Sequence, residues 1–205
     1  DVVCPWCIVG YKRLEQAIAS VKQQANVEIH WQPFELNPNM PPEGQNLGEH
    51  LAEKYGSTPE QSAANRENLV RIGQSLDFEF NFSSDSRIYN TFQAHQLLCW
   101  AGEQGLQHQL KLALFTAYFT NQQDPSDVTN LLNIAESVGL SKQEAETVLT
   151  SNKYADDIRE QQQFWQSHGV QAVPAVILEQ KYLISGAQET ASFAQALQQV
   201  IDEAE

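Results

Sequence analysis

Cys4 to Cys7 (CPWC) stands at the start of the first helical pattern of the chain, and the rest of the sequence is best interpreted from it. Pro5 suits the first turn of a helix, because its missing N–H has no intrahelical partner there. Apolar residues then recur every three or four positions from Ile8 to Val21, which predicts an amphipathic helix. The sequence therefore places two cysteines, one turn apart, at a helix N-terminus.

This position favours redox chemistry at the first cysteine. The free N–H groups and the positive end of the helix dipole stabilise a thiolate, which predicts a pKa of Cys4 below that of a free cysteine. Cys7 is then placed to attack a mixed disulfide formed at Cys4 and to release the substrate. Pro5 stiffens the turn, and Trp6 adds a flat apolar surface beside the thiol.

A strand and a long helical block follow the first helix. Asn26–Phe34 (NVEIHWQPF) is rich in β-branched and aromatic residues and predicts a strand, and the Pro-rich stretch 36–44 predicts a loop. Helix signals dominate from about Leu47 to Ser167, and only Phe78–Phe82 (FEFNF) interrupts them as a short extended piece.

After Gly169 the pattern changes to a hairpin and a last helix. Val173-Pro174 precedes a short apolar strand at 175–179, a second strand follows at 182–185, and 190–201 predicts an amphipathic helix. The order of elements predicts an α/β fold with a large all-helical insertion. Residues 1–45 and 169–205 would form one discontinuous domain, and residues 46–168 would form the helical insertion domain.

The net charge of the chain argues against two classes of partner. The chain has 205 residues, and its acidic residues outnumber basic ones by 26 to 12, which gives a formal charge of −14. Nucleic acids and anionic lipid surfaces reward clusters of Lys and Arg, so neither is an expected partner. No window approaches about eighteen uninterrupted apolar residues, so no membrane span is expected.

The three cysteines are too few for a disulfide framework. A pair of buried structural cysteines is one alternative for Cys4 and Cys7. Zinc is another, because His95 and Cys99 form an H-x3-C pair that would complete a Cys₃His site with CPWC. A stiff Pro-Trp pair at a helix start argues against zinc, so no metal is expected among the site residues. Without zinc, Cys99 is expected to be a small buried hydrophobe.

Five blocks of sequence together resemble the DsbA family of thioredoxin-fold proteins, and most closely its FrnE-like branch. That branch includes the 2-hydroxychromene-2-carboxylate isomerases and, more distantly, the kappa-class glutathione transferases. The resemblance implies a thioredoxin-like fold for residues 1–45 and 169–205. The blocks are Asp1–Cys7 (DVVCPWC), Trp31–Pro38 (WQPFELNP), Asn90–Leu98 (NTFQAHQLL), Val173–Leu178 (VPAVIL) and Ser185–Gln188 (SGAQ).

The resemblance also implies roles for residues outside the CxxC motif. The bond between Val173 and Pro174 would be cis and lie against the thiols, which leaves the backbone of Val173 free to pair with an incoming peptide or glutathione cysteine. The helix that carries Asn90, Thr91 and His95 would lie over the thiols. Asn90 and Thr91 would then contact substrate, and His95 would carry a proton or help to hold the thiolate.

Simpler interpretations stand beside these roles. His95 equally suits a hydrogen-bonded core histidine, and Thr91 suits a helix cap or a packing residue. Gly186-Ala187-Gln188 corresponds to the corner that holds the γ-glutamyl group in glutathione-binding relatives, and a turn with capping explains the same residues.

The sequence departs from its relatives at two points. The isomerases and the kappa-class transferases typically have Ser where Cys4 stands, and a seryl oxygen cannot form a mixed disulfide, so the chain resembles the oxidoreductase end of the branch. The family also has a full strand before the CxxC motif, whereas only Asp1–Val3 precede it here. We therefore expect the native protein to have several more residues before Asp1.

Three functions follow from these patterns. The leading one is a thiol–disulfide oxidoreductase with Cys4 as nucleophile and Cys7 as resolving thiol. It requires no organic cofactor and acts on a disulfide- or thiol-bearing protein or small molecule, with glutathione as a potential thiol co-substrate. The second is a glutathione-dependent isomerase or transferase of a small aromatic compound. The third is a non-catalytic binding or chaperone module.

The resemblance to this family implies a cytoplasmic location and a homodimer. A chain with one working thiol pair would also suit an exported protein. The substrate, the redox potential and the direction of the reaction are not encoded in any pattern of this sequence.

Overall fold

The computed structural model describes residues 1–204 and divides into two compact units. The larger unit comprises Asp1–Val3 and His30–Phe164, and the smaller unit comprises Cys4–Ile29 and Trp165–Glu205. The larger unit is mainly helical, whereas the smaller unit combines two helices with a β-hairpin.

The smaller unit consists of α1 (Pro5–Val21), β3 (Ala175–Leu178), β4 (Tyr182–Ser185) and α9 (Thr190–Ala204). The two strands are antiparallel, with Val176 opposite Ile184. Their connection has left-handed backbone at both Glu179 and Gln180, as a tight hairpin turn requires. The predicted first helix, hairpin and terminal helix are thus confirmed.

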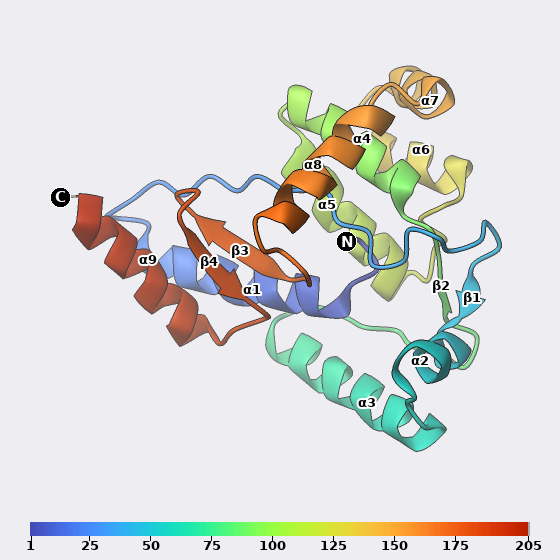
Figure 1. Cartoon of the computed structure of the whole chain (residues 1–205), viewed down its shortest axis with the longest axis horizontal. Coiled ribbons are helices and arrows are strands. Elements are labelled where there is room, and N and C mark those ends of the chain that lie inside the picture. Colours follow the sequence, from blue (N-terminus) through green and yellow to red (C-terminus); the bar gives the residue numbers. More distant parts are fainter. Residues whose placement is uncertain (205) are drawn as a thin grey trace. The chain divides into compact units, whose positions relative to one another are not determined.

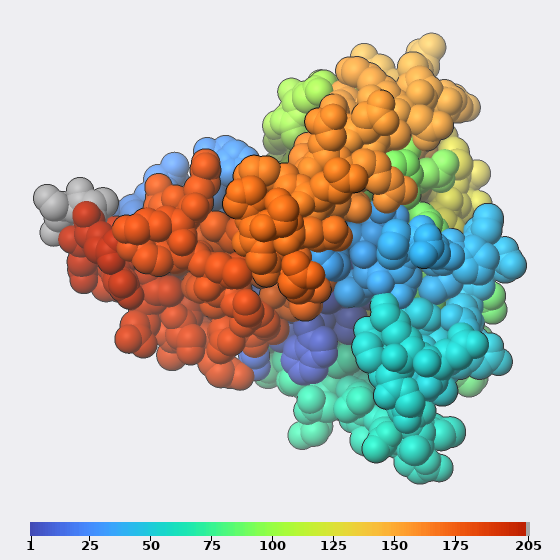
Figure 2. Space-filling model, viewed as in Figure 1, coloured from blue at the N-terminus to red at the C-terminus, as the bar shows by residue number. Residues whose placement is uncertain are grey.

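The core of this unit lies between α1, α9 and the hairpin. Leu14 and Val21 of α1 pack against Phe193 and Leu197 of α9, and Val176 of β3 covers them. Figure 1 shows α1 and α9 side by side with the hairpin next to them. In the space-filling view the hairpin and α9 form one continuous surface, drawn in red (Figure 2).

The larger unit is mainly helical, and buried residues between Ala94 and Ile158 form most of its main apolar core. Its helices begin at polar caps where the sequence provides them: Thr58 forms a capping box with Gln61, and the side chains of Asp127 and Ser141 cap two later helices. The elements are β1 (Gln45–Asn46), α2 (Leu47–Tyr55), α3 (Pro59–Ser75), β2 (Arg87–Ile88), α4 (Phe92–Glu103), α5 (Gln107–Phe115), the π-helix η1 (Thr116–Thr120), α6 (Val128–Ser137), α7 (Lys142–Ser151) and α8 (Ala155–Ser167).

Two predicted extended segments are not strands. Exposure alternates along Asn26–Phe34, but no strand of the described residues pairs with it, so it forms no ladder. Phe78–Phe82 is irregular as well. Its aromatic rings pack on one another instead, with Phe80 edge-on to Phe119 at a centroid distance of 5.1 Å. Ring packing and isolated hydrogen bonds, such as the one from the Asn81 N–H to the Phe119 carbonyl at 2.8 Å, therefore hold the second segment without a strand ladder.

The bounds of the units differ from the predicted domain boundaries, because residues 1–3 and 30–45 join the larger unit and residues 165–168 join the smaller one. The Gln107 side chain explains part of this difference. Its oxygen accepts from the backbone N–H of Trp31 at 2.9 Å, and its nitrogen donates to the Trp31 carbonyl at 3.0 Å. The Trp31 backbone thus pairs with a helix side chain where the sequence predicted a strand neighbour.

Among residues 1–204, no helix is both long enough and apolar enough to cross a membrane.

Two helical glycines in the larger unit give a test of its packing. A Cβ at Gly73 would lie 2.5 Å from the Phe78 carbonyl oxygen, whereas a Cβ at Gly102 would meet nothing closer than the Gln107 side chain at 3.6 Å. We expect Gly73→Ala to lower the free energy of unfolding by about 1–3 kcal/mol, since the backbone must shift. The matched control Gly102→Ala should raise it by about 0.5–1 kcal/mol. Urea unfolding measures both, and changes of equal sign would contradict this packing.

Candidate functional site

The two cysteines of the CPWC motif lie in the first turn of α1, in the smaller unit. Cys4 is the N-cap residue with extended backbone, and Pro5 opens the helix. The N–H of Cys7 donates to the Cys4 carbonyl at 3.1 Å, which closes the turn. Both cysteines are buried thiols that are not joined in a disulfide, whereas Trp6 between them is 41% exposed, as expected for a surface residue. The motif thus presents an aromatic ring outward beside two covered sulfur atoms.

The segment before β3 lies beside the first thiol. The Cys4 Sγ donates to the Val173 carbonyl at 4.0 Å, and the peptide bond between Val173 and Pro174 is cis. Gly10 of α1 faces the same segment, because a Cβ there would lie 3.3 Å from the Pro174 Cγ. A hollow of about 210 Å³ opens along this segment and is lined by residues 169–175 with Leu183, Ser185 and Gly186.

The corner after β4 is tied to the same segment. Gly186, in the left-handed region with φ +81°, donates its N–H to the Pro174 carbonyl at 2.8 Å. The Gln188 side chain donates to the Ser185 carbonyl at 2.8 Å. The Ala187 carbonyl accepts from the Arg13 guanidinium at 2.7 Å. The predicted glutathione corner is therefore also a hydrogen-bonded turn that α1 holds in place.

The acidity of Cys4 is opposite to the prediction. Its pKa is raised well above the usual value, first by the hydrogen bond with the Cys7 side chain and then by burial of the thiol. Two adjacent thiols lose their protons in coupled steps, and the charge of one opposes ionisation of the other. The lowered pKa expected from the helix N-terminus is therefore wrong for Cys4 as the structure holds it. A single helix end does not outweigh burial and a neighbouring thiol.

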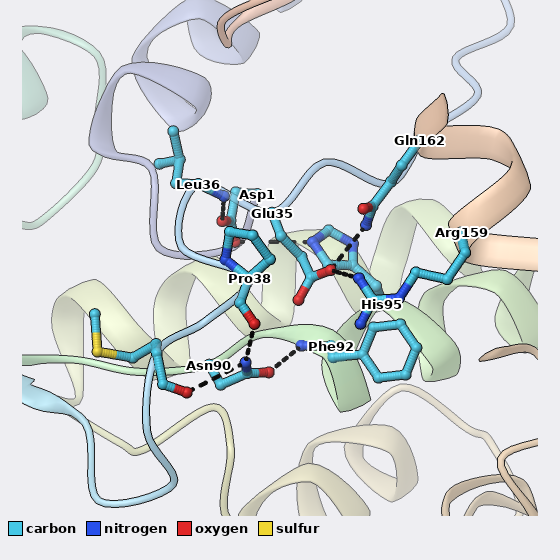
Figure 3. A network of polar contacts seen from close by, with 10 residues as sticks. Asp1, Glu35, Leu36, Pro38, Asn90, Phe92, His95, Arg159 and Gln162 are labelled. Carbon is cyan, nitrogen blue, oxygen red and sulfur yellow. Dashed lines mark hydrogen bonds and ion pairs between the residues drawn. The ribbon is translucent and has the colours of Figure 1, made fainter. Parts of the chain in front are cut away.

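Three other predicted site residues belong to the start of α4 in the larger unit. Asn90 accepts from the Phe92 N–H at 2.9 Å and donates to the Pro38 carbonyl at 3.3 Å, so it both caps the helix and holds the Pro-rich loop (Figure 3). Thr91 is buried and makes no side-chain cap. His95 follows one turn later and is also buried.

His95 is held as a neutral imidazole. Burial lowers its pKa well below the usual value, and the Nε2 atom has no hydrogen-bond partner. The Oδ1 atom of Asp1 lies 3.8 Å from this nitrogen (Figure 3). His95 and the half-buried Cys99 both line a cavity of about 230 Å³ between the loop 30–33, α4, α5 and α8. Burial raises the pKa of Cys99, and the negative charge of Asp157 raises it further.

A buried carboxylate beside this cluster was missed from sequence. The Glu35 side chain is 1% exposed, and its Oε2 accepts from Arg159 at 2.5 Å and from Gln162 at 3.1 Å (Figure 3). Its Oε1 is buried without a partner. The Arg159 guanidinium also stacks 4.1 Å from the centre of the Phe92 ring. The only signal in sequence is that Glu35 directly follows the WQPF stretch.

No metal centre is evident. Within the described part of the chain, residues 1–204, no three His, Cys, Asp or Glu side chains are grouped closely enough to hold a metal ion.

Comparison with known proteins matches the DSBA-like thioredoxin domain over residues 1–198. A structure described as a probable DsbA oxidoreductase from Streptomyces coelicolor is 32% identical, with a TM-score of 0.92 over 97% of this chain and 86% of that one. The predicted fold class and the family resemblance are thus confirmed.

Two structures of lower identity share the fold. A 2-hydroxychromene-2-carboxylate isomerase is 15% identical, with a TM-score of 0.72 over 100% of this chain and 94% of that one. The cytosolic disulfide reductase DsbM from Pseudomonas aeruginosa, in a structure with GSH, is 15% identical, with a TM-score of 0.66 over 98% and 96% of the two chains.

The effect of Cys7 on Cys4 leads to a prediction about pH. We expect Cys7→Ala to lower the pKa of Cys4, because it removes the largest cause of the raised value. The rate of alkylation of Cys4 by iodoacetamide should then reach half of its plateau at lower pH. Mass spectrometry of the Cys4 peptide, with Cys99→Ala in both proteins, gives the profile. A half-point that stays in place or moves to higher pH would contradict the coupling.

The Glu35 carboxylate leads to a prediction about stability. Arg159→Ala leaves a buried carboxylate with Gln162 as its remaining donor, so the free energy of unfolding should fall by about 1–3 kcal/mol. Arg71→Ala, at an exposed position of α3 where Arg71 bonds only to nearby Asn68, is the matched control and should change it by less than about 0.5 kcal/mol. If urea unfolding gave the same change in the free energy of unfolding for both variants, the buried Glu35 carboxylate would not depend on Arg159.

Proposed function

Because the chain belongs to the DSBA-like thioredoxin domain family, we propose that it is a thiol–disulfide oxidoreductase whose reacting groups are Cys4 and Cys7. One observation carries the proposal: Cys4 stands at the N-cap of α1, with Cys7 in the same turn and the Val173 carbonyl 4.0 Å from its sulfur. A nucleophilic thiol, a resolving thiol and a backbone edge for a substrate are thus gathered in one unit.

The proposed cycle has two displacement steps. The Cys4 thiol first releases its proton, and the resulting thiolate attacks one sulfur of a substrate disulfide, so that a mixed disulfide forms and the other substrate sulfur leaves as a thiolate. The Cys7 thiolate then attacks the Cys4 sulfur and expels the second substrate thiolate. The substrate gains two electrons, and the protein is left with a bond between Cys4 and Cys7. An external dithiol or glutathione returns the pair to its reduced form.

Neighbouring residues support these steps in the proposal. Pro5 and Trp6 shape the first turn, and the backbone of Val173, fixed by Pro174, pairs with the chain that carries the substrate cysteine. The proposal keeps His95 in a supporting role as a proton carrier, although burial lowers its pKa and so weakens it as a proton acceptor.

The proposal also names substrate contacts. Asn90 and Thr91 near the start of α4, and the corner formed by Gly186, Ala187 and Gln188, contact the substrate. The Ala187 carbonyl and the Gln188 side chain already make the hydrogen bonds described above, so a ligand would bind to the other groups of this corner.

Partners and location follow from the same chemistry. No organic cofactor is needed, since the two cysteines carry the electrons, and the substrates are proteins or small molecules with thiols or disulfides. The likeness in fold to a cytosolic disulfide reductase seen with GSH supports glutathione as a co-substrate and the cytoplasm as the location. A homodimer stays a prediction.

A second function is a glutathione-dependent isomerase of a small aromatic compound. It is favoured by the likeness in fold to 2-hydroxychromene-2-carboxylate isomerase. It needs a group that orients the glutathione thiol but no resolving cysteine. The two functions therefore differ in whether Cys7 is required for turnover.

The test of the proposed function is the redox equilibrium of the pair. Cys99→Ala protein is equilibrated with mixtures of reduced and oxidised glutathione, and its free thiols are then alkylated and counted by mass spectrometry. We expect Cys4 and Cys7 to become oxidised together and reversibly, because two thiols in one helical turn form a single couple. Cys4→Ala in the same background is the control and should form no intramolecular disulfide.

A pair that stays reduced in excess oxidised glutathione would overturn the oxidoreductase. Turnover of an aromatic substrate with glutathione that survives Cys7→Ala would then favour the isomerase.

A further inference from the structure

One face of α1 holds the corner after β4. Gly10 and Arg13 are three residues apart and therefore lie on the same side of the helix. A Cβ at Gly10 would lie 3.4 Å from the Cα of Ala187, so the two backbones touch there. Arg13 donates to the Ala187 carbonyl at 2.7 Å, and its other terminal nitrogen pairs with Glu189 at 2.7 Å. The corner is thus fixed at two points on one helix.

These contacts complete a closed path back to the reacting sulfur. Gly186, next to Ala187, donates its N–H to the Pro174 carbonyl at 2.8 Å. Val173, the preceding residue, accepts from the Cys4 thiol at 4.0 Å. Cys4 in turn caps the helix that carries Arg13. All of these links lie within the smaller unit, so a change at Arg13 reaches the thiol through three hydrogen bonds, two of them short and the last, at the sulfur, 4.0 Å long.

We propose that Arg13 is a positioning residue of the thiol site, which fixes the Val173–Pro174 segment at its distance from Cys4 by holding the Ala187 carbonyl. Arg13 makes no bond to either cysteine, so it acts through the segment and not on the reacting atoms. The part of the proposal that concerns reaction with disulfides rests on the proposed function. The part that concerns the geometry around Cys4 does not.

The chemistry of this contact suits arginine. The Arg13 side chain is 14% exposed and binds two acceptors in different directions, which a planar guanidinium does with two of its nitrogens at once. Glu189 is 73% exposed, so that ion pair is screened by solvent and contributes little on its own. The hydrogen bond to the Ala187 carbonyl is therefore the contact that matters for position.

The expected effect on Cys4 has a definite sign. The Val173 carbonyl accepts from the protonated thiol and therefore favours it over the thiolate. When Arg13→Met releases the corner and the Val173–Pro174 segment, this acceptor moves away, and the pKa of Cys4 should fall. Simple loss of a positive charge would do the opposite, since a cation favours a thiolate. The direction of the change therefore separates positioning from a charge effect.

The experiment uses the full chain with Cys7→Ala and Cys99→Ala, so that Cys4 is the remaining thiol and no other cysteine titrates beside it. The pH profile of alkylation by iodoacetamide is compared with and without Arg13→Met. We expect its half-point to move to lower pH by about one pH unit. The rate of mixed disulfide formation with oxidised glutathione, corrected for the thiolate fraction, should fall about 10-fold, since the docking edge is displaced.

Two controls exclude other causes. Glu189→Gln removes the ion pair but keeps the bond to Ala187, so both readouts should stay as in the parent protein. Leu197→Ala lowers stability from the buried core of the same unit without touching the corner, so it should leave the pH half-point in place.

An unchanged or higher half-point in Arg13→Met, or an equal downward shift in Leu197→Ala, would overturn the positioning role. If the parent protein forms no mixed disulfide at all, the proposed function fails, and the pH profile still decides the role of Arg13.

Discussion

The thiol site depends on the close approach of α1 to the segment at Pro174. Gly10 permits it, because a side chain there would press on the Pro174 ring and on the backbone of Ala187. The helix that begins at Cys4 therefore lies directly against the backbone that faces the thiol, which brings the sulfur to 4.0 Å from the Val173 carbonyl. Close backbone packing at Gly10 thus permits the geometry that the Arg13 contact then holds, and interiors of native density resist deforming such packing.

For the buried polar groups of the larger unit, the constraint is the free-energy cost of burying a charge. Burial of an unpaired charge lowers the stability of the fold by roughly several kcal/mol. A carboxylate avoids this cost by pairing with a cation, whereas a histidine avoids it by losing its proton. Glu35 follows the first course with Arg159, and His95 follows the second, since burial lowers its pKa. The two residues lie in the same cluster (Figure 3) and meet the cost of burial in different ways, Glu35 through a cationic partner and His95 through its lowered pKa.

Most of the fold was predictable because its signals are local. The first helix, the hairpin after Pro174 and the terminal helix each carry their own periodicity or turn residues, and they form as expected. The strand predicted over Asn26–Phe34 does not form, because a strand exists only with a partner, which local sequence does not reveal, and Trp31 bonds instead to a helix side chain. The site shows the same division. The positions of the two cysteines follow from sequence, but Arg13 acts across the fold, and no local pattern reveals it.

The acidity of Cys4 links structure to the energetics of a thiol pair. The hydrogen bond from its S–H to the Val173 carbonyl exists only while Cys4 carries a proton, and a disulfide cannot make it. It therefore stabilises the reduced pair relative to the oxidised one, which raises the reduction potential of such a couple. The same hydrogen bond reduces the fraction of thiolate at neutral pH and slows attack by the reduced pair. One arrangement thus acts in opposite directions on the equilibrium and on the rate, and the Val173 carbonyl contributes to both.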